Sequence, residues 1–267
     1  MARDLVCIHV EEGELSRPYE LKVEDLRANA VIAIHNQADG STGFFEELLD
    51  VEINRQQISL AIPNEIALAL NNAWRAFSAA KALRPALLTT LKASKIVHGA
   101  SVTQFYDYLE LIQTALVFNY KALEAFCNAV TPDNFVHEKR DGRGVLQRYD
   151  KPAIERWLKT TEKITEILPA VLQCPSPKDQ PFWSSFIDLE RLRNEIIHSK
   201  SMTSSSVLAE LFSPRIDRLL QSAVSLLKYF HSHSPDNAAF PLEFGTSKIR
   251  AISIPDFDSY LEQVPEA

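Results

Sequence analysis

The spacing of apolar residues predicts a chain that is helical over most of its length. From residue 64 onwards apolar positions recur every three or four residues, which is the spacing of one face of an α-helix. Proline, glycine and polar clusters interrupt the pattern and mark the expected helix ends. The predicted helices are 64–84, 86–96, 101–131, 150–168, 183–198 and 214–230.

Specific residues indicate where these helices begin. Pro85 is expected to separate the first two helices. Ser101 with Gln104 three residues later has the arrangement of a capping box. Asp150 is a candidate N-cap, and Ser213-Pro214 is a start signal for the final helix. The apolar face expected for the 150–168 helix includes Trp157.

The first 62 residues contain short apolar runs whose period does not separate strand from helix. Residues 5–10 and 58–62 fit strands, whereas 23–37 and 44–53 fit helices better. Near the other end, 249–254 fits a strand.

We therefore expect a mainly α protein in three parts. Residues 1–98 form an N-terminal extension of unknown role, partly helical and of mixed α or α/β type. Residues 99–235 form an antiparallel helical bundle, and residues 236–267 form an irregular tail with at most a short strand.

Composition places the chain among ordinary globular proteins. Hydrophobic residues make up 46% of its 267 residues, and the net charge is −7. No basic field covers the molecule, so contact with a nucleic acid requires a local patch. The three cysteines are widely spaced and fit reduced thiols. Without an apolar signal or a stretch long enough to span a bilayer, we expect a cytoplasmic protein that does not bind membranes.

One arginine breaks the apolar face of the helix expected at 183–198. Leu189, Leu192 and Ile196 cluster on that face, and Arg193 falls within it. Burying an unpaired guanidinium is costly, so Arg193 requires a polar partner. Asn119 and Glu124 on the 101–131 helix are the candidates. Taken alone, Asn119 fits a bond to neighbouring backbone and Glu124 fits a solvated edge.

A group of cations follows the longest predicted helix, in a segment expected to be an exposed loop at 137–144. It fits either a solvated face or a contact with a phosphate backbone. The cations of this segment are Lys139, Arg140 and Arg143, and Arg148 lies just beyond it.

The sequence lacks the common nucleotide-binding, zinc-protease and serine-hydrolase motifs. His231 and His233 lie at a predicted helix end, where we expect no metal site. The set Arg193, Asn194 and His198 fits a phosphodiester. A histidine can transfer a proton at neutral pH, and a guanidinium binds phosphate oxygens. With the RNA 2′-hydroxyl as nucleophile, this chemistry needs neither a metal nor a cofactor. An internal ion pair and a helix-capping histidine explain the same residues.

The run Arg193-Asn194-Glu195-Ile196-Ile197-His198 resembles the R-N-x-x-x-H signature of HEPN domains, a helical family with many metal-independent endoribonucleases. The segment 120–128, which contains Leu-Glu-Ala-Phe and a later Asn, is similar to the family's upstream helix, and 157–169 resembles its connecting helix. The resemblance covers about half the chain, from residue 101 to 231.

The resemblance implies an RNA-cleaving site. Arg193 would stabilise charge on the scissile phosphate, His198 would transfer a proton, Asn194 would hold the histidine, and Glu124 would face the motif across the bundle. Family members usually form homodimers with two motifs in one cleft, which here would have the 137–148 segment at its rim. The resemblance also suggests a toxin-like or phage-defence role, with an antitoxin or regulatory protein as a further partner.

Two other interpretations remain open. Some HEPN domains bind a protein partner or nucleotide without cleaving RNA. Arg193 could also serve the fold alone, in which case replacing it by leucine would be tolerated.

Overall fold

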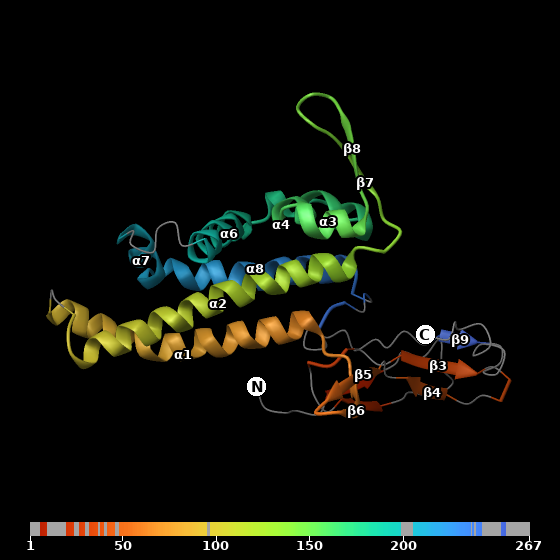
Figure 1. Cartoon of the computed structure of the whole chain (residues 1–267), viewed down its shortest axis with the longest axis horizontal. Coiled ribbons are helices and arrows are strands. Elements are labelled where there is room, and N and C mark those ends of the chain that lie inside the picture. The colour runs from red at the N-terminus through yellow and green to blue at the C-terminus, as the bar shows by residue number, and fades with distance from the viewer. Residues whose placement is uncertain are drawn as a thin grey trace. The chain divides into compact units, whose positions relative to one another are not determined.

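Most of the chain is described by a computed structural model, and the described part is mainly helical, as expected (Figure 1). The chain divides into two compact units, residues 1–67 with 234–267 and residues 68–233. The boundary expected at residue 98 falls inside the second unit. The described residues are 6–9, 20–23, 27–29, 32–36, 38–39, 42–45, 48–94, 97–198, 205–235, 237, 239–241 and 252–254.

Short strands form the first unit. β1 (Val6–His9) pairs antiparallel with β2 (Glu20–Val23). β3 (Ile32–Asn36) lies between antiparallel β4 (Thr42–Phe45) and parallel β9 (Ile252–Ile254). Because β9 comes from the other end of the sequence, its pairing with β3 explains why the two ends of the chain belong to one unit.

A tight hairpin precedes the first helix. β5 (Leu48–Ile53) pairs with β6 (Gln56–Ala61) through a turn at Asn54 and Arg55. Both turn residues have positive φ, 53° and 64°, as the two central residues of a type I′ turn require. Asn64 follows, and its side-chain oxygen accepts the N–H of Ala67 at 2.9 Å.

The helices predicted at 23–37 and 44–53 are wrong, because β3, β4 and β5 occupy those residues. Short apolar runs suit both structures, and the pairing of β3 with β4 and β9 and of β5 with β6 decided between them. The strands expected within 5–10, 58–62 and 249–254 do contain strand residues.

Long helices build the second unit. They are α1 (Glu65–Ala93, which begins three residues before the unit), α2 (Ala100–Val130), α6 (Trp183–Ile197), α7 (Ser205–Phe212) and α8 (Arg215–His233). α2, α6 and α8 pack against one another.

The predicted faces of α8 and α6 form much of the core. All six positions expected on α8 are buried, and so are the inner positions of α6. They are Ile216, Leu219, Leu220, Ala223, Leu227 and Phe230 on α8, and Phe186, Leu189 and Leu192 on α6. Ile196, also expected on the inner face, is only partly buried.

α1 is one helix with Pro85 inside it, so the predicted break is wrong. A proline removes one backbone hydrogen bond, and tertiary contacts on either side offset that loss. Arg84 pairs with Asp217 at 3.0 Å and donates to the carbonyl of Phe212, while Leu87 is buried.

The capping box at Ser101 is also wrong. α2 already begins at Ala100, and Gly99, with φ 62°, occupies the N-cap without a side-chain hydrogen bond. Because the helix starts one residue earlier than expected, Ser101 lies inside its first turn. The cap at Asp150 is confirmed, since its carboxylate accepts the N–H of Ala153 at 3.0 Å.

The single helix expected at 150–168 is wrong. Four short pieces replace it: α3 (Lys151–Trp157), α4 (Thr160–Glu162), the π-helix η1 (Lys163–Ile167) and α5 (Leu168–Leu172). α3 ends at Trp157, so the apolar residues that follow belong to another helix and do not continue the same face. The Trp157 side chain is therefore 66% exposed instead of buried.

The π-helix has a local cause in the sequence. Pro169 has no N–H to donate to the preceding turn, which frees the wider π spacing. The Leu168 N–H bonds the carbonyl of Lys163, five residues earlier. Lys163 is buried, and its ammonium donates to Asn128 Oδ1 at 3.0 Å and to the Glu155 carbonyl at 3.1 Å.

The loop expected at 137–144 is a hairpin. β7 (His137–Arg140) pairs antiparallel with β8 (Leu146–Tyr149). Asp141 closes the turn by accepting the backbone N–H groups of Arg143 and Val145. The sequence did not predict this hairpin because most of its residues are exposed. Alternating apolar and polar residues, which identify a strand, are expected only where one face of the strand is buried.

Besides β2, two further elements were not predicted. The 3₁₀ turn η2 (Pro177–Asp179) lies within the proline-rich segment, and α7 begins at Ser205, in a serine-rich stretch that resembles a loop. No helix in the described residues has the length and apolar character needed to cross a membrane.

Candidate functional site

Arg193 lies in a polar network between α2 and α6. Its Nη2 is 3.5 Å from Glu124 Oε2, and its Nη1 donates to Asn194 Oδ1 at 2.9 Å. The guanidinium carbon stands 4.7 Å from the centre of the Tyr120 ring, in cation–π geometry. The Arg193 side chain is 22% exposed, so it is neither a core residue nor a surface one.

The network continues through Glu190, one turn before Asn194 on α6. Tyr120 donates to Glu190 Oε1 at 2.7 Å, and Thr161 of α4 donates to the other oxygen. Burial, followed by the hydrogen bond to Glu190, raises the pKa of Tyr120 above its ordinary value of 10. The phenol is therefore a fixed donor at neutral pH.

α4 supplies a second hydroxyl to the network. Thr160 is buried and donates to Glu124 Oε1 at 3.3 Å, while Glu124 Oε2 faces Arg193. Two carboxylates and one guanidinium thus share the network, which carries one net negative charge when all three are ionised. Hydroxyl donors, rather than a second cation, stabilise the charge on Glu190.

One nitrogen of Arg193 has no hydrogen-bond partner. Its Nε is buried, and within the described residues no acceptor reaches it. A buried donor left without a partner costs about 1–3 kcal/mol. The guanidinium is therefore held by Glu124, Asn194 and Tyr120, and a ligand could reach only the exposed part of the side chain, not the buried Nε.

His198 ends α6, as the sequence predicts. It is the C-cap residue, its side chain is exposed, and its backbone N–H bonds the carbonyl of Asn194 at 3.0 Å. Among the described residues no hydrogen bond or ion pair holds the imidazole. We expected the Asn194 side chain to hold His198. Among the described residues, the Asn194 Oδ1 atom accepts a hydrogen bond from Arg193 and not from His198.

Asn119 does not join Arg193. It is buried, and its amide donates to the carbonyl of Leu220 at 2.8 Å, so it links α2 to α8. Of the two partners expected for Arg193, the structure brings only Glu124 to it.

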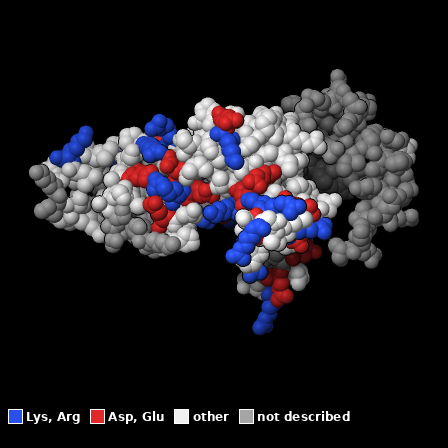
Figure 2. Space-filling view, turned by 90° about the horizontal axis from the view of Figure 1, so that it is seen from above, with Lys and Arg blue, Asp and Glu red and all other residues white. Residues whose placement is uncertain are grey.

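The cations of the hairpin are largely matched by acceptors. Lys139 pairs with Glu162 at 2.7 Å, Arg148 lies 3.9 Å from Glu138, and Arg140 donates to the Gly144 carbonyl at 2.9 Å. Arg143 is exposed at the turn. On the face seen in Figure 2, Lys and Arg side chains are interspersed with Asp and Glu, and no continuous basic surface forms.

Sequence reasoning missed Glu190, Tyr120 and Thr161. For Glu190 a signal existed, because it precedes Arg193 by three residues and Asn194 by four, and residues at those spacings lie side by side on a helix. For Tyr120 and Thr161 there was none, since their contacts depend on how α2 and α4 meet α6.

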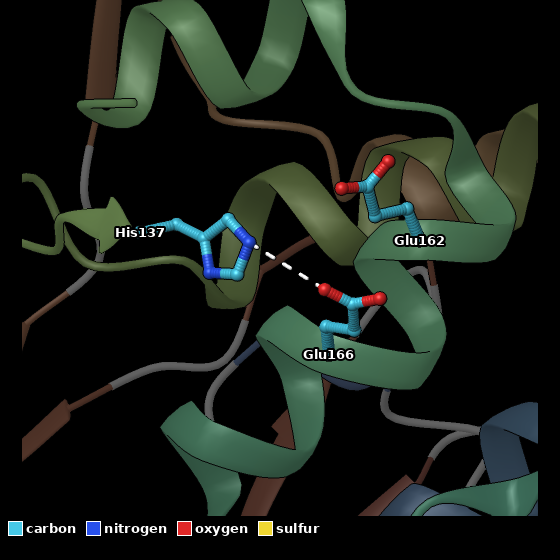
Figure 3. Close-up of side chains that lie close together, drawn as sticks. All are labelled: His137, Glu162 and Glu166. Carbon is cyan, nitrogen blue, oxygen red and sulfur yellow. Dashed lines mark ion pairs between the residues drawn. The ribbon is translucent and has the colours of Figure 1, made fainter. Parts of the chain in front are cut away.

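One group in the described part of the chain has the composition of a metal site. His137 of β7, Glu162 of α4 and Glu166 of η1 have nitrogen and oxygen atoms within 4.8 Å of one another (Figure 3).

The fold and the network define a mainly helical protein with a half-buried arginine site on α6. No family model matches the chain, and neither the curated proteins nor the solved structures contain a match to it.

Proposed function

We propose that the protein is a HEPN-type endoribonuclease that cleaves RNA without a metal ion. The observation that carries the proposal is the Arg193 network. Glu124, Asn194 and Tyr120 orient the guanidinium, the Arg193 side chain is 22% exposed, and the exposed His198 follows five residues later at the end of the same helix. Oriented cations are suited to stabilise charge that develops in a transition state.

In the proposed reaction the 2′-oxygen of a ribose attacks the adjacent phosphorus. Its proton passes to a base, the bond from phosphorus to the 5′-oxygen breaks, and that oxygen leaves with a proton from an acid. The products are a 2′,3′-cyclic phosphate and a 5′-hydroxyl. His198 transfers a proton, and Arg193 stabilises the negative charge on the phosphate oxygens.

A homodimer would complete this site. One histidine cannot be both base and acid in a single concerted step, whereas two copies of His198 in one cleft could divide these roles. The hairpin 137–149 would lie at the rim, with Lys139, Arg140, Arg143 and Arg148 near the RNA backbone. Arg143 is the best placed, because the other three already have acceptors. A cytoplasmic role in phage defence or as a toxin restrained by an antitoxin or regulatory protein fits this activity.

A second function has support of its own. Arg193 already has a carboxylate, an amide oxygen and an aromatic face, and the network carries a net negative charge that opposes phosphate. Of the two ligands expected for a non-catalytic HEPN-like module, a protein partner or a nucleotide, these features fit the protein partner better, because a nucleotide carries phosphate. In that case His198→Ala leaves function intact.

Incubation of the purified full chain with total RNA and with tRNA in EDTA separates the two functions. We expect fragments with 2′,3′-cyclic phosphate ends from the wild type and from Arg191→Ala, which changes an exposed arginine on the same helix. His198→Ala and Arg193→Ala should leave the RNA intact. If no variant cleaves, or if all cleave equally, the catalytic assignment is wrong.

A further inference from the structure

The base of the β7–β8 hairpin holds a mixed group of metal-ligating side chains. His137 comes from β7, Glu162 ends α4, and Glu166 lies on the π-helix. Figure 3 shows the imidazole and the Glu166 carboxylate pointing toward one another, with Glu162 on the adjoining turn. All three ligand atoms lie within 4.8 Å of one another. We propose that these residues bind a divalent transition-metal ion, of the Zn²⁺ or Mn²⁺ class, which fastens the hairpin to η1.

The distance between two of the three ligand atoms fits such an ion closely. His137 Nε2 and Glu166 Oε2 are 3.5 Å apart. Two ligands at about 2.0–2.1 Å from a tetrahedral ion are separated by about 3.3–3.4 Å, so this pair needs almost no movement. The Glu162 carboxylate, within 4.8 Å of the other two ligand atoms, must move closer to them, which rotation of its terminal side-chain bonds provides.

The imidazole itself gives an independent reason for a ligand. The His137 side chain is 16% exposed, and its ring packs against Tyr149 at 6.4 Å. Its Nε2 atom is buried and makes no hydrogen bond with any described residue, although the Glu166 carboxylate is near. In the neutral tautomer with its proton on Nδ1, the imidazole presents a lone pair at Nε2, and a metal ion would satisfy it.

The ligand types select the class of ion. One imidazole nitrogen and two carboxylate oxygens suit Zn²⁺ or Mn²⁺, whereas Ca²⁺ and Mg²⁺ prefer oxygen alone. Three protein ligands would leave at least one position for water. The sequence hides the site because His137 and the two glutamates are far apart, and a break between α3 and α4 brings them together.

Lys139 competes for the site. Its ammonium pairs with Glu162 Oε1 at 2.7 Å, so a metal ion must displace it or share the carboxylate. This competition predicts a weakened site whose affinity rises when the lysine is removed. α4 connects the site to the Arg193 network, because Thr160 and Thr161 bond Glu124 and Glu190 while the next residue is Glu162.

Calorimetric titration of the full chain, first stripped with EDTA and dialysed, tests the site with ZnCl₂ and MnCl₂ as probes. We expect one ion bound per chain and a higher melting temperature in its presence. His137→Ala and the isosteric Glu166→Gln should each weaken binding by about 100-fold or more, at or above the upper end of the 10–100-fold range typical of outer-shell changes. Lys139→Met should strengthen it.

His233→Ala is the control, because His233 also lies outside the Arg193 network but is exposed and bonds the Tyr229 carbonyl at 2.9 Å. It should bind as the wild type does. The proposal is overturned if the wild type binds neither ion, or if His137→Ala and Glu166→Gln bind as tightly as His233→Ala. Circular dichroism of each variant shows whether it is folded. RNA cleavage in EDTA is independent of this result.

Discussion

Two arginines two residues apart on α6 have opposite surroundings. Arg191 is 42% exposed and lies near three carboxylates, with Glu210 at 2.6 Å, Glu195 at 3.0 Å and Asp188 at 3.9 Å. Arg193 is 22% exposed and has one carboxylate, Glu124 at 3.5 Å, together with an aromatic face.

Arg191 has more ion pairs than Arg193, but its side chain is the more exposed of the two. Exposed pairs gain little because water and salt screen them. Arg193 lies where the local dielectric is lower, with hydroxyls of Tyr120, Thr160 and Thr161 arranged around the same carboxylates. Variants at Arg193, at its neighbours and at Arg191 test this difference between the two arginines.

Replacing Arg193 gives the largest expected effect. Arg193→Leu should lower the rate of RNA cleavage by about 10²–10³-fold, the size of losing one transition-state donor. The variant should remain folded but be less stable than the wild type, since leucine is of similar size whereas Glu124 and Glu190 lose the cation of their network. Cleavage assays paired with urea unfolding measure both quantities. Wild-type cleavage by folded Arg193→Leu would assign the arginine to the fold alone.

Alkaline pH should destabilise the interior around α2. Burial raises the pKa of the Cys127 thiol from 9 to about 12, and burial raises that of Tyr120 above 10. Between pH 9 and 12 the unfolded thiol loses its proton while the folded one keeps it. The free energy of unfolding therefore falls as pH rises through that window, by up to about 1.4 kcal/mol per pH unit for one such group.

Cys127→Ala tests this pH dependence. Urea unfolding at pH 8, 9, 10 and 11 should give a shallower decline in the variant than in the wild type. Parallel curves for the two proteins would show that the folded thiol ionises normally.

Tyr120→Phe isolates the hydroxyl from the ring. It removes the donor to Glu190 and keeps the aromatic face under Arg193, so unfolding free energy should fall by about 1 kcal/mol. Tyr106→Phe is the control, because Tyr106 is 58% exposed on the same helix and should change stability very little. If both changes lower the free energy of unfolding equally, the Tyr120 hydroxyl stabilises the fold no more than an exposed hydroxyl does, which contradicts the prediction.

The smallest effect belongs to Arg191. Arg191→Ala should cost no more than about 0.5–1 kcal/mol despite its three carboxylates, and it should leave cleavage unchanged. A loss that matches that of Arg193→Leu in both assays would contradict the proposed difference between them.

The sequence predicted the parts of the fold that depend on long, regular patterns. α8 has an uninterrupted apolar face, and the face of α6 is interrupted only by Arg193, so most of their buried residues follow from spacing. Pro85 misled the prediction because tertiary contacts of Arg84 and Leu87 keep α1 continuous. The strands of the first unit depend on pairings such as β3 with β9, which are more than 200 residues apart and leave no local signal.

The candidate site was predictable in part. Arg193 stood out as a charge on an apolar face, and Glu124 was one of its two expected partners. Asn119 was the other, yet α2 and α8 approach so closely that the Leu220 carbonyl takes its amide. The role of α4 was hidden, because its threonines reach Glu124 and Glu190 only after the chain breaks between α3 and α4.

The most direct test is the rate at which His198→Ala cleaves RNA in EDTA, with and without added imidazole. His198 is exposed at the end of α6, so its loss should leave stability unchanged and open space for a small base. We expect the rate to fall by about 10²–10⁴-fold, the usual contribution of a general acid or base, and imidazole to restore part of it. Cleavage by His198→Ala at the wild-type rate would contradict the proposed site.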